Sequence, residues 1–175
     1  MIEYTVKVHE DGSRFWFFNN KRHREDGPAV EWKNGHKQWW FNGLYHREDG
    51  PAIKYPDGTK EWYRNGERHR EDGPACKFAN GNKEWFLNGK LHRSDGPAIE
   101  CSNGFKKWYL NDKLHREDGP AVEYPNGDKY WYVNGKYLTE EEFNQRIKKH
   151  TIIVDGKTIE ISEESYQKMK DSLTS

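Results

Sequence analysis

The sequence is poor in the residues from which a large apolar core is built. Only 33% of its 175 residues are hydrophobic, which equals the share of charged residues, and its mean hydropathy is −1.26. It has no apolar run of membrane-spanning length and no signal-peptide pattern, so we expect no membrane partner and a cytoplasmic location. Its 29 basic and 29 acidic side chains give a formal net charge of zero. No global field therefore attracts the chain to nucleic acid or to an anionic membrane.

Cysteine is scarce as well. The only two, Cys76 and Cys101, fall where equivalent positions elsewhere carry apolar side chains such as Ile53 and Tyr124. We therefore expect both to be reduced residues of the core, as is usual in the cytoplasm, rather than a disulfide.

Aromatic residues, in contrast, are abundant and are placed at a fixed period. The chain has eight Trp, ten Tyr and eight Phe, which argues against a disordered chain. Six of the tryptophans are each 23 residues apart, which predicts one short unit repeated six times. Such a unit must stack on its neighbours to bury its apolar side chains. The six are Trp16, Trp39, Trp62, Trp85, Trp108 and Trp131.

Two turn signals recur in every unit, and they predict a chain that reverses direction about every ten residues. One precedes the periodic tryptophan, as at Asn34-Gly35, and the other follows it, as at Asn42-Gly43. Both favour type I′ hairpin turns, which need a positive φ at two residues. Between them, runs such as Pro51 to Tyr55 alternate apolar and charged side chains, as a half-buried strand does. The predicted fold is mainly β, an elongated single-layer sheet of β-hairpin repeats.

A second aromatic residue adjoins the periodic tryptophan in the later units. Neighbouring residues of a strand point to opposite faces of the sheet. We therefore expect one face to form the packed core and the other to carry an aromatic stripe. The pairs are Trp39-Trp40, Trp62-Tyr63, Trp85-Phe86, Trp108-Tyr109 and Trp131-Tyr132.

The consensus of the unit is carried most fully by residues 118–136, in the form D-G-P-A-x-E-Y-x-N-G-x-K-x-W-Y-x-N-G-K. This stretch resembles the MORN-type repeat in its divergent variants, over residues 4–138. The H-R-E-D-G-P-A form is similar to repeats of uncharacterised bacteriophage and giant-virus proteins. The resemblance implies stacked β-hairpins that serve scaffolding, dimerisation and binding. The glycine-rich G-x-G pattern of the eukaryotic repeat is missing here, so its lipid-binding role is not implied.

The C-terminal end departs from the repeat where a sixth H-R-E-D stretch would begin. Thr139 and Glu142 form a capping box there, which predicts a helix to about His150. A hairpin around Asp155-Gly156 follows, and Ser162 then caps a second helix.

We therefore divide the chain into a MORN-like repeat domain, residues 1–138, and a small C-terminal α/β cap, residues 139–175. This αββα cap is expected to cover the last sheet edge and so to prevent edge-to-edge aggregation. At the other end, the alternation of apolar residues over 2–8 is one residue out of register with the later units. The mismatch predicts either a bulge or a different edge pairing.

A cluster of His, Arg, Glu and Asp recurs in five units, with Ser94 in place of the Glu in the fourth, and suggests a metal or acid–base site. However, equivalent histidines are two strands or roughly 10 Å apart, whereas ligands lie ~2 Å from a shared zinc ion. Adjacent residues of a turn also point in different directions. We therefore expect no catalytic residue, no metal site, no cofactor and no enzymatic activity. The clusters begin at His23, His46, His69, His92 and His115.

The remainder of the cluster predicts a structural turn. Gly27 is expected to supply a positive φ, and Pro28 to start the next strand. The charged residues before them can reach the adjacent repeat and help to fix the register. The alternative is a ladder of arginines that faces a ligand on one side of the sheet. Its members are Arg24, Arg47, Arg70, Arg93 and Arg116.

Non-enzymatic protein binding or scaffolding is the favoured function. A rigid repeat sheet presents Tyr, Trp and Arg, which are enriched at interface hot spots. The second unit has an enlarged aromatic patch, with Trp32, Trp40 and Phe41 as candidate binding residues. Because the repeat form is similar to viral ones, we expect the partner to be a host protein, such as a defence protein that the chain inhibits in the host cytoplasm.

The alternative function is nucleic-acid binding, or an accessory role to an enzyme, through the arginine and aromatic ladders. Nucleic acid is the less favoured partner, because each basic residue of the motif has an acidic neighbour and the pI is about 7.1. A homodimer through the open first edge or the C-terminal element is also expected.

Overall fold

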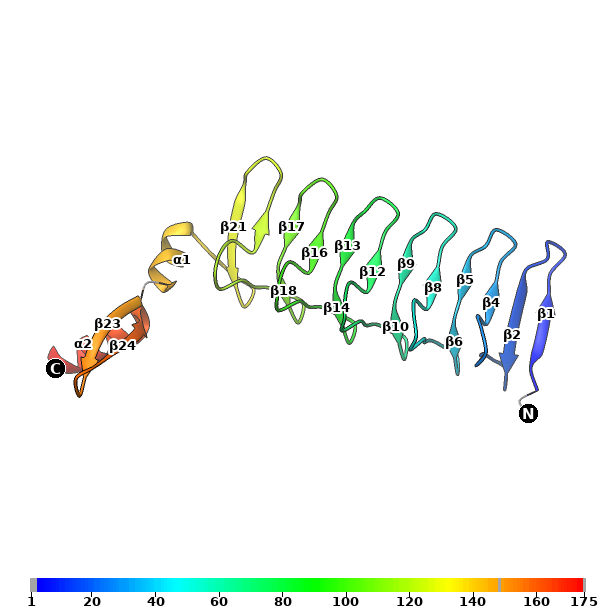
Figure 1. The fold of residues 1–175 in the computed structure, drawn as a ribbon, viewed down its shortest axis with the longest axis horizontal. Coiled ribbons are helices and arrows are strands. Elements are labelled where there is room, and N and C mark those ends of the chain that lie inside the picture. The colour runs from blue at the N-terminus through cyan, green and yellow to red at the C-terminus, as the bar shows by residue number, and fades with distance from the viewer. Residues whose placement is uncertain (1–2, 148, 175) are drawn as a thin grey trace.

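The computed structural model describes residues 3–147 and 149–174 of the chain. Hairpins stand side by side in one row, and the C-terminal helices and strands lie beyond the last hairpin (Figure 1). The fold class expected from the sequence is confirmed: the chain is mainly β, with a long antiparallel sheet of hairpin repeats and an α/β segment at its C-terminal end.

Fourteen strands form the long antiparallel sheet. It begins with β1 (Thr5–Val8) and β2 (Arg14–Phe18), which β3 (Lys21–Arg22) joins, and it ends with β21 (Lys129–Val133) and β22 (Lys136–Leu138). The strands between them follow the order of the chain. They are β4 (Val30–Glu31), β5 (Lys37–Gln38), β8 (Ile53–Lys54), β9 (Lys60–Glu61), β12 (Cys76–Lys77), β13 (Lys83–Glu84), β16 (Ile99–Glu100), β17 (Lys106–Lys107) and β20 (Val122–Glu123).

A shorter hairpin follows in each of the four middle units. Gly43 N donates to Arg22 O at 2.9 Å, and Gly66 N donates to Tyr45 O at 2.8 Å, so each short hairpin is bonded to the unit before it. The short hairpins therefore widen the same layer and do not form a second one. They are β6 (Trp40–Phe41) with β7 (Leu44–Tyr45), β10 (Tyr63–Arg64) with β11 (Glu67–Arg68), β14 (Phe86–Leu87) with β15 (Lys90–Leu91), and β18 (Tyr109–Leu110) with β19 (Lys113–Leu114).

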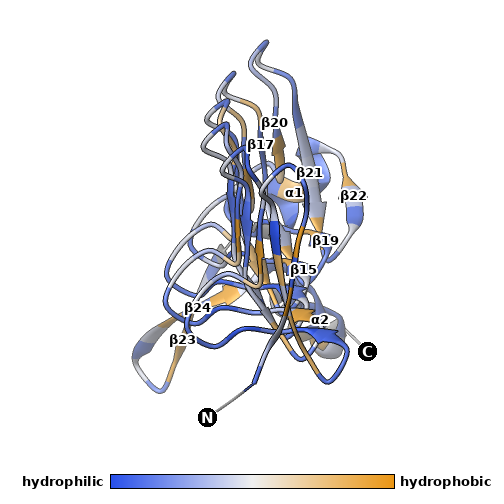
Figure 2. Cartoon of the chain, turned by 90° about the vertical axis from the view of Figure 1, so that its right-hand side faces the viewer, coloured by the Kyte–Doolittle hydropathy of each residue, from blue (hydrophilic) through white to orange (hydrophobic). Residues whose placement is uncertain are grey.

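The loop that carries His-Arg-Glu-Asp-Gly-Pro leaves the sheet between these two kinds of hairpin. Before it, Arg47 N still donates to Tyr63 O at 3.2 Å, and after it Ala52 O accepts from Trp39 N at 2.8 Å. Viewed along the row, the connecting loops bulge to one side of the strands (Figure 2). We call the side that carries Trp39 and its periodic equivalents, over which these loops fold, the loop face. The opposite side is called the smooth face.

Both hairpin turns form where the sequence predicts them, but only one is of type I′. In Asn42-Gly43 both residues have a positive φ, 50° and 85°, as a type I′ turn requires. In the other turn only Gly35 is positive, at 88°, and its N–H donates to Trp32 O at 3.0 Å. This is a type I turn closed by a G1 bulge. Asn34 contributes a bond from His36 N to its Oδ1, at 3.0 Å.

The core of the sheet is thin and runs along the row. The alanine that follows each loop is fully buried, and the next residue in the chain is usually a buried apolar side chain on the smooth face. Its members include Ala29, Val30, Ala52, Ile53, Ala75, Cys76, Ala98, Ala121 and Val122.

The N-terminal strand keeps the register of the later units without a bulge. Phe15 lies between Lys7 on one side and Val30 on the other, so Lys7 occupies the register position of Val30. The neighbouring side chains, Val6 and Val8, therefore point to the loop face, where 44% and 65% of their surfaces are exposed. The predicted bulge or changed pairing is therefore wrong. The strand pairs in the regular register, and the out-of-register valines are left exposed on the loop face.

The predicted capping box starts α1 (Glu140–Ile147). Thr139 N donates to Glu142 Oε2 at 2.8 Å, and Glu142 N donates to Thr139 Oγ1 at 3.1 Å. Phe143 of this helix is buried with Val133 and Leu138, so α1 packs on the last two strands of the sheet.

The rest of the C-terminal segment also follows the predicted order. β23 (Lys149–Val154) and β24 (Lys157–Ser162) form a hairpin around Asp155-Gly156, and α2 (Glu163–Thr174) comes next. Ser165 N donates to Ser162 Oγ at 3.2 Å, which is the predicted cap. The first helix is shorter than predicted, because His150 already lies in β23.

Candidate functional site

Each loop of the loop face holds an arginine against the ring of a periodic tryptophan. In the third loop, Arg70 Cζ lies 4.2 Å from the centroid of Trp62, and Arg70 Nε donates to Asp72 Oδ1 at 2.8 Å. The same contacts recur in the other four loops, and only 18–22% of each arginine side chain is exposed. The pairs are Arg24 on Trp16, Arg47 on Trp39, Arg70 on Trp62, Arg93 on Trp85 and Arg116 on Trp108.

These arginines also change the acidity of the loops. The hydrogen bond from each guanidinium holds the pKa of the loop aspartate below its ordinary value. The aspartates are therefore ionised at neutral pH, and each is already paired with a cation of its own loop. The positive charge of each guanidinium is therefore largely neutralised by the aspartate of its own loop.

The loop glycine makes room for the guanidinium. A Cβ on Gly27 would lie 3.0 Å from Arg24 Cζ, and one on Gly96 would lie 2.8 Å from Arg93 Cζ. Neither glycine has a positive φ. The prediction that Gly27 supplies a positive φ is therefore wrong. The guanidinium lies where a side chain of this residue would begin, most closely at Gly96, so a Cβ there would displace it.

The histidines of the clusters join neighbouring repeats. His69 Nδ1 lies 2.8 Å from Asn88 Oδ1, and Asn88 N donates to the same nitrogen at 3.2 Å. In the described part of the chain, no group of three or more His, Cys, Asp or Glu side chains is arranged to hold a metal ion. The imidazoles act here as links across the array. The pairs are His23 with Asn42, His46 with Asn65, His69 with Asn88, His92 with Asn111 and His115 with Asn134.

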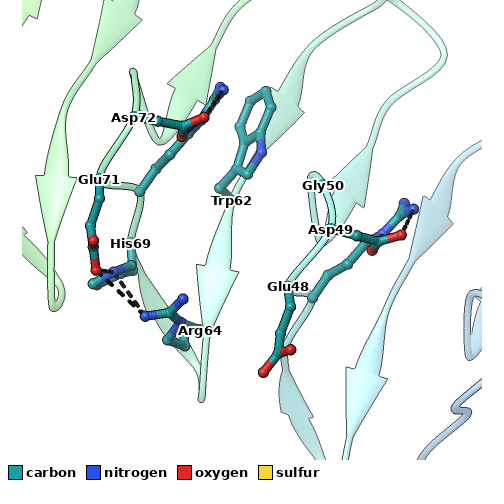
Figure 3. Close-up of a pocket in the computed structure, with 10 residues that line it drawn as sticks. Glu48, Asp49, Gly50, Trp62, Arg64, His69, Glu71 and Asp72 are labelled. Atoms are coloured by element: carbon teal, nitrogen blue, oxygen red, sulfur yellow. Dashed lines mark hydrogen bonds and ion pairs between the residues drawn. The ribbon is translucent and has the colours of Figure 1, made fainter.

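Open clefts separate successive loops on the loop face. In the cleft of Figure 3, Trp62 stands between two loops, and Glu71 lies 3.3 Å from His69 Nε2 and 3.6 Å from Arg64 Nη1. The two aspartates that line it are turned toward their own arginines. Much of the charge in the cleft is thus neutralised by ion pairs among the residues that line it. Equivalent clefts lie beside Trp39, Trp85 and Trp108.

One position differs in character from cleft to cleft, two residues after the periodic tryptophan. Phe41 occupies it in the second unit, 41% exposed, with its ring 4.6 Å from His23 and 5.8 Å from His46. Arg64, Leu87 and Leu110 take this place in the following clefts.

The smooth face carries an unbroken row of aromatic side chains. The residue after each periodic tryptophan points to this face, since neighbours on a strand alternate. It is aromatic in all six units, half-buried in each, and two strands or about 9.6 Å from the next. The row is Phe17, Trp40, Tyr63, Phe86, Tyr109 and Tyr132.

The aromatic row is widest in the first two units. The rings of Trp40 and Tyr45 are 3.8 Å apart, and Arg22 Cζ lies 5.1 Å from the Trp40 ring and 6.0 Å from Phe15. Trp32 meets Phe15 edge to face at 5.7 Å. Two tryptophans, a tyrosine, a phenylalanine and an arginine therefore form one continuous surface.

In the middle of the smooth face, three polar side chains are joined by hydrogen bonds. Tyr63 O–H donates to Glu61 Oε2 at 2.9 Å, and Arg68 donates to both side chains, at 3.1 and 3.3 Å. Burial raises the pKa of Tyr63 to about 12, and it raises the pKa of the nearby Cys76 thiol to about 12. Both groups stay protonated at neutral pH, so this site offers no thiolate nucleophile there.

The candidate binding residues from the sequence divide between the two faces. Trp32 and Trp40 share the smooth face, whereas Phe41 and the five ladder arginines lie on the loop face. Trp32, Trp40 and Phe41 therefore do not form one patch. Arg22 and Tyr45, which were not predicted from the sequence, join Trp32 and Trp40 on the smooth face. Their signal is the cross-strand pairing around the second turn, as in Trp40 opposite Tyr45.

Comparison with protein-family models and with curated proteins finds no match for this chain. Among the described residues, none of the helices has the length and apolar character needed to cross a membrane.

Proposed function

We propose that the chain is a non-enzymatic protein-binding module, a scaffold of MORN-like repeats that binds its partner on the smooth face. The observation that carries this proposal is the continuous surface of Trp32, Trp40, Tyr45 and Arg22. Trp, Tyr and Arg are the side chains most enriched at interface hot spots. A surface held by cross-strand contacts is preorganised, which reduces the entropy lost on binding.

The loop face supports this function less well. Its arginines are stacked, paired with aspartates and mostly covered, so their charge is not free for a ligand. The same pairing weighs against nucleic acid, since phosphate binding needs cations that can exchange counterions. Phe41 and its cross-strand partner Leu44 are both exposed on this face, at 41% and 50%, but they form only a small apolar pair, and small exposed apolar groups are common on protein surfaces.

The resemblance to viral repeats supports a host protein as the partner. We propose that binding blocks that protein, for example a defence protein in the host cytoplasm. A rigid row of repeats suits this role, because one flat surface can cover a large area of a folded partner without reordering its own chain.

The test compares Trp40 and Phe41, which are neighbours in one strand and point to opposite faces of the sheet. Wild-type protein, the Trp40→Ala variant and the Phe41→Ala variant are immobilised, and each is exposed to the same host lysate. We expect one stoichiometric protein on the wild type and on Phe41→Ala, and at least tenfold less of it on Trp40→Ala, because loss of a hot-spot residue costs about 2 kcal/mol or more.

Far-UV circular dichroism of each variant is the control for folding, and Tyr109→Ala tests the same face far from Trp40. Loss of the protein from Phe41→Ala alone would place binding on the loop face. Retention of nucleic acid without protein, read from the 260/280 nm ratio and a steep salt dependence, would contradict the proposal.

A further inference from the structure

The first strand of the sheet leaves a row of backbone groups open at the end of the array. His9 N donates to Ser13 O at 2.9 Å, which fixes the hydrogen-bond phase of β1 against β2. Groups of an antiparallel strand alternate in direction, so residues 5, 7 and 9 bond toward β2. Trp16 N confirms the phase, because it turns away from β1 and donates to Ala29 O at 2.8 Å.

The N–H and C=O groups of Tyr4, Val6 and Val8 therefore point away from β2, in the plane of the sheet, toward its open edge. Within residues 3–147 and 149–174, no backbone group bonds to those of Val6 or Val8 on this side. The far end of the row differs, because β22 and α1 pack against β21 there. An uncovered edge of this kind is a template for another strand.

This alternation restricts the registers in which β1 can pair with β1 of a second copy. In an antiparallel pair with itself, an outward-bonding residue must meet another outward-bonding residue. Tyr4 can thus lie opposite Tyr4, Val6 or Val8 of the second copy, but not opposite Thr5 or Lys7. The allowed registers then differ in the charges that they bring together on the smooth face.

One of these registers is complementary in charge. With Tyr4 opposite Val6 of the second copy, Glu3 falls opposite Lys7, and the two-fold symmetry makes this pair twice. Thr5 then meets Thr5. Placing Tyr4 opposite Val8 instead sets Lys7 against Thr5, and larger shifts bring Lys7 against Lys7. A lysine in an edge strand normally opposes such pairing, but here Glu3 neutralises it.

We propose that two copies of the chain associate through β1 in the register that places Tyr4 opposite Val6 and Glu3 opposite Lys7. An antiparallel pair within one sheet has its two-fold axis perpendicular to the sheet. The smooth faces of both copies therefore lie on the same side, and the aromatic row continues across the junction. The association is isologous and closed, so it stops at the dimer.

The contact is small, since β1 has four residues. We expect a dissociation constant of roughly 10 μM to 1 mM, as is usual for interfaces below the standard size. Sedimentation velocity over a concentration series through this range measures it. The mass should rise from 20.9 kDa toward twice that value.

Charge variants test the register. Glu3→Lys and Lys7→Glu should each weaken dimerisation about tenfold, because each turns two attractive cross-strand pairs into repulsive ones. An equimolar mixture of the two variants should restore a heterodimer, since every 3–7 pair is then attractive again. Glu10→Lys is the matched control for Glu3→Lys: it makes the same change of charge outside the paired residues and should leave the mass curve unchanged.

A second variant tests the edge itself. Val6→Pro removes an outward N–H without touching the bonds of β1 to β2, and proline is tolerated at such positions. It should be monomeric at every concentration. A constant 20.9 kDa for the wild type would overturn the proposal. So would a Val6→Pro variant that still dimerises, or a mixture that stays monomeric. Because the test needs no other protein, it is independent of the host-lysate experiment.

Discussion

Replacement of Gly96 by alanine tests whether the stacked arginines hold the loops in place. The new Cβ would lie 2.8 Å from Arg93 Cζ, closer than real Cβ contacts, so the guanidinium would have to move. It would then leave its place 4.1 Å from the Trp85 ring, and it would lose hydrogen bonds to Asp95 and Glu100.

The expected loss of stability follows from these contacts. A cation–π contact at a mostly covered site contributes about 1 kcal/mol. The bond from Arg93 to the half-buried Glu100 contributes about 1 kcal/mol after allowance for solvent screening. Against this, alanine restricts the unfolded chain, which stabilises by about 0.4–1 kcal/mol where φ is ordinary, as it is at Gly96. We expect Gly96→Ala to lower the free energy of unfolding by about 1–1.6 kcal/mol.

Urea unfolding followed by tryptophan fluorescence measures the change. Gly50→Ala is the matched control, because its Cβ would lie 3.3 Å from Arg47 Cζ and needs only a small adjustment. We expect it to be close to neutral. In an Arg93→Ala background, Gly96→Ala should become neutral or stabilising, since nothing remains to be displaced. An equal loss in both backgrounds would refute the reasoning.

Three further changes test other parts of the structure. Phe143→Ala should cost about 3–4 kcal/mol locally and expose the amides of α1 to hydrogen exchange, while those of distant repeats stay protected; loss of protection throughout the sheet would contradict nearest-neighbour stacking. Cys101 should react with a disulfide reagent much faster than Cys76, which is buried and whose thiol pKa is raised to about 12; equal rates would contradict the buried site. The lowered pKa values of the loop aspartates stabilise the fold fully above the ordinary value of 3.8, and this stabilisation is lost as the pH falls through the lower folded-state values. The melting temperature should therefore fall steeply below pH 4, and a flat profile from pH 6 to 2 would contradict the pairing.

The repeat and the C-terminal segment could be predicted because their signals are local. The tryptophan period fixes the unit, and the Asn42-Gly43 dipeptide favours the type I′ turn that forms there. Thr139 and Glu142 likewise form their capping box within one turn of helix. The type of the turn that precedes the periodic tryptophan was harder to predict. Asn34-Gly35 has the same residues, but it lies in a longer loop whose closure depends on the flanking strands.

The role of the loop glycine could not be predicted, since it depends on a contact made in the folded state. Gly27 precedes a proline in a turn, which suggests a positive φ, but the approach of Arg24 decides the residue type. The separation of Trp40 from Phe41 was accessible from strand alternation alone. The contribution of Arg22 was not, because it requires knowledge of which strand lies beside Trp40.

Both faces of the sheet are open to a partner only if the chain forms one extended layer. Thirteen strand positions follow one another along the sheet, which gives a width of about 58 Å. Small-angle X-ray scattering of the Val6→Pro variant tests this most directly. We predict a radius of gyration of at least about 20 Å for such a slab. A value near 16 Å, as expected for a compact globular chain of this length, would contradict the account.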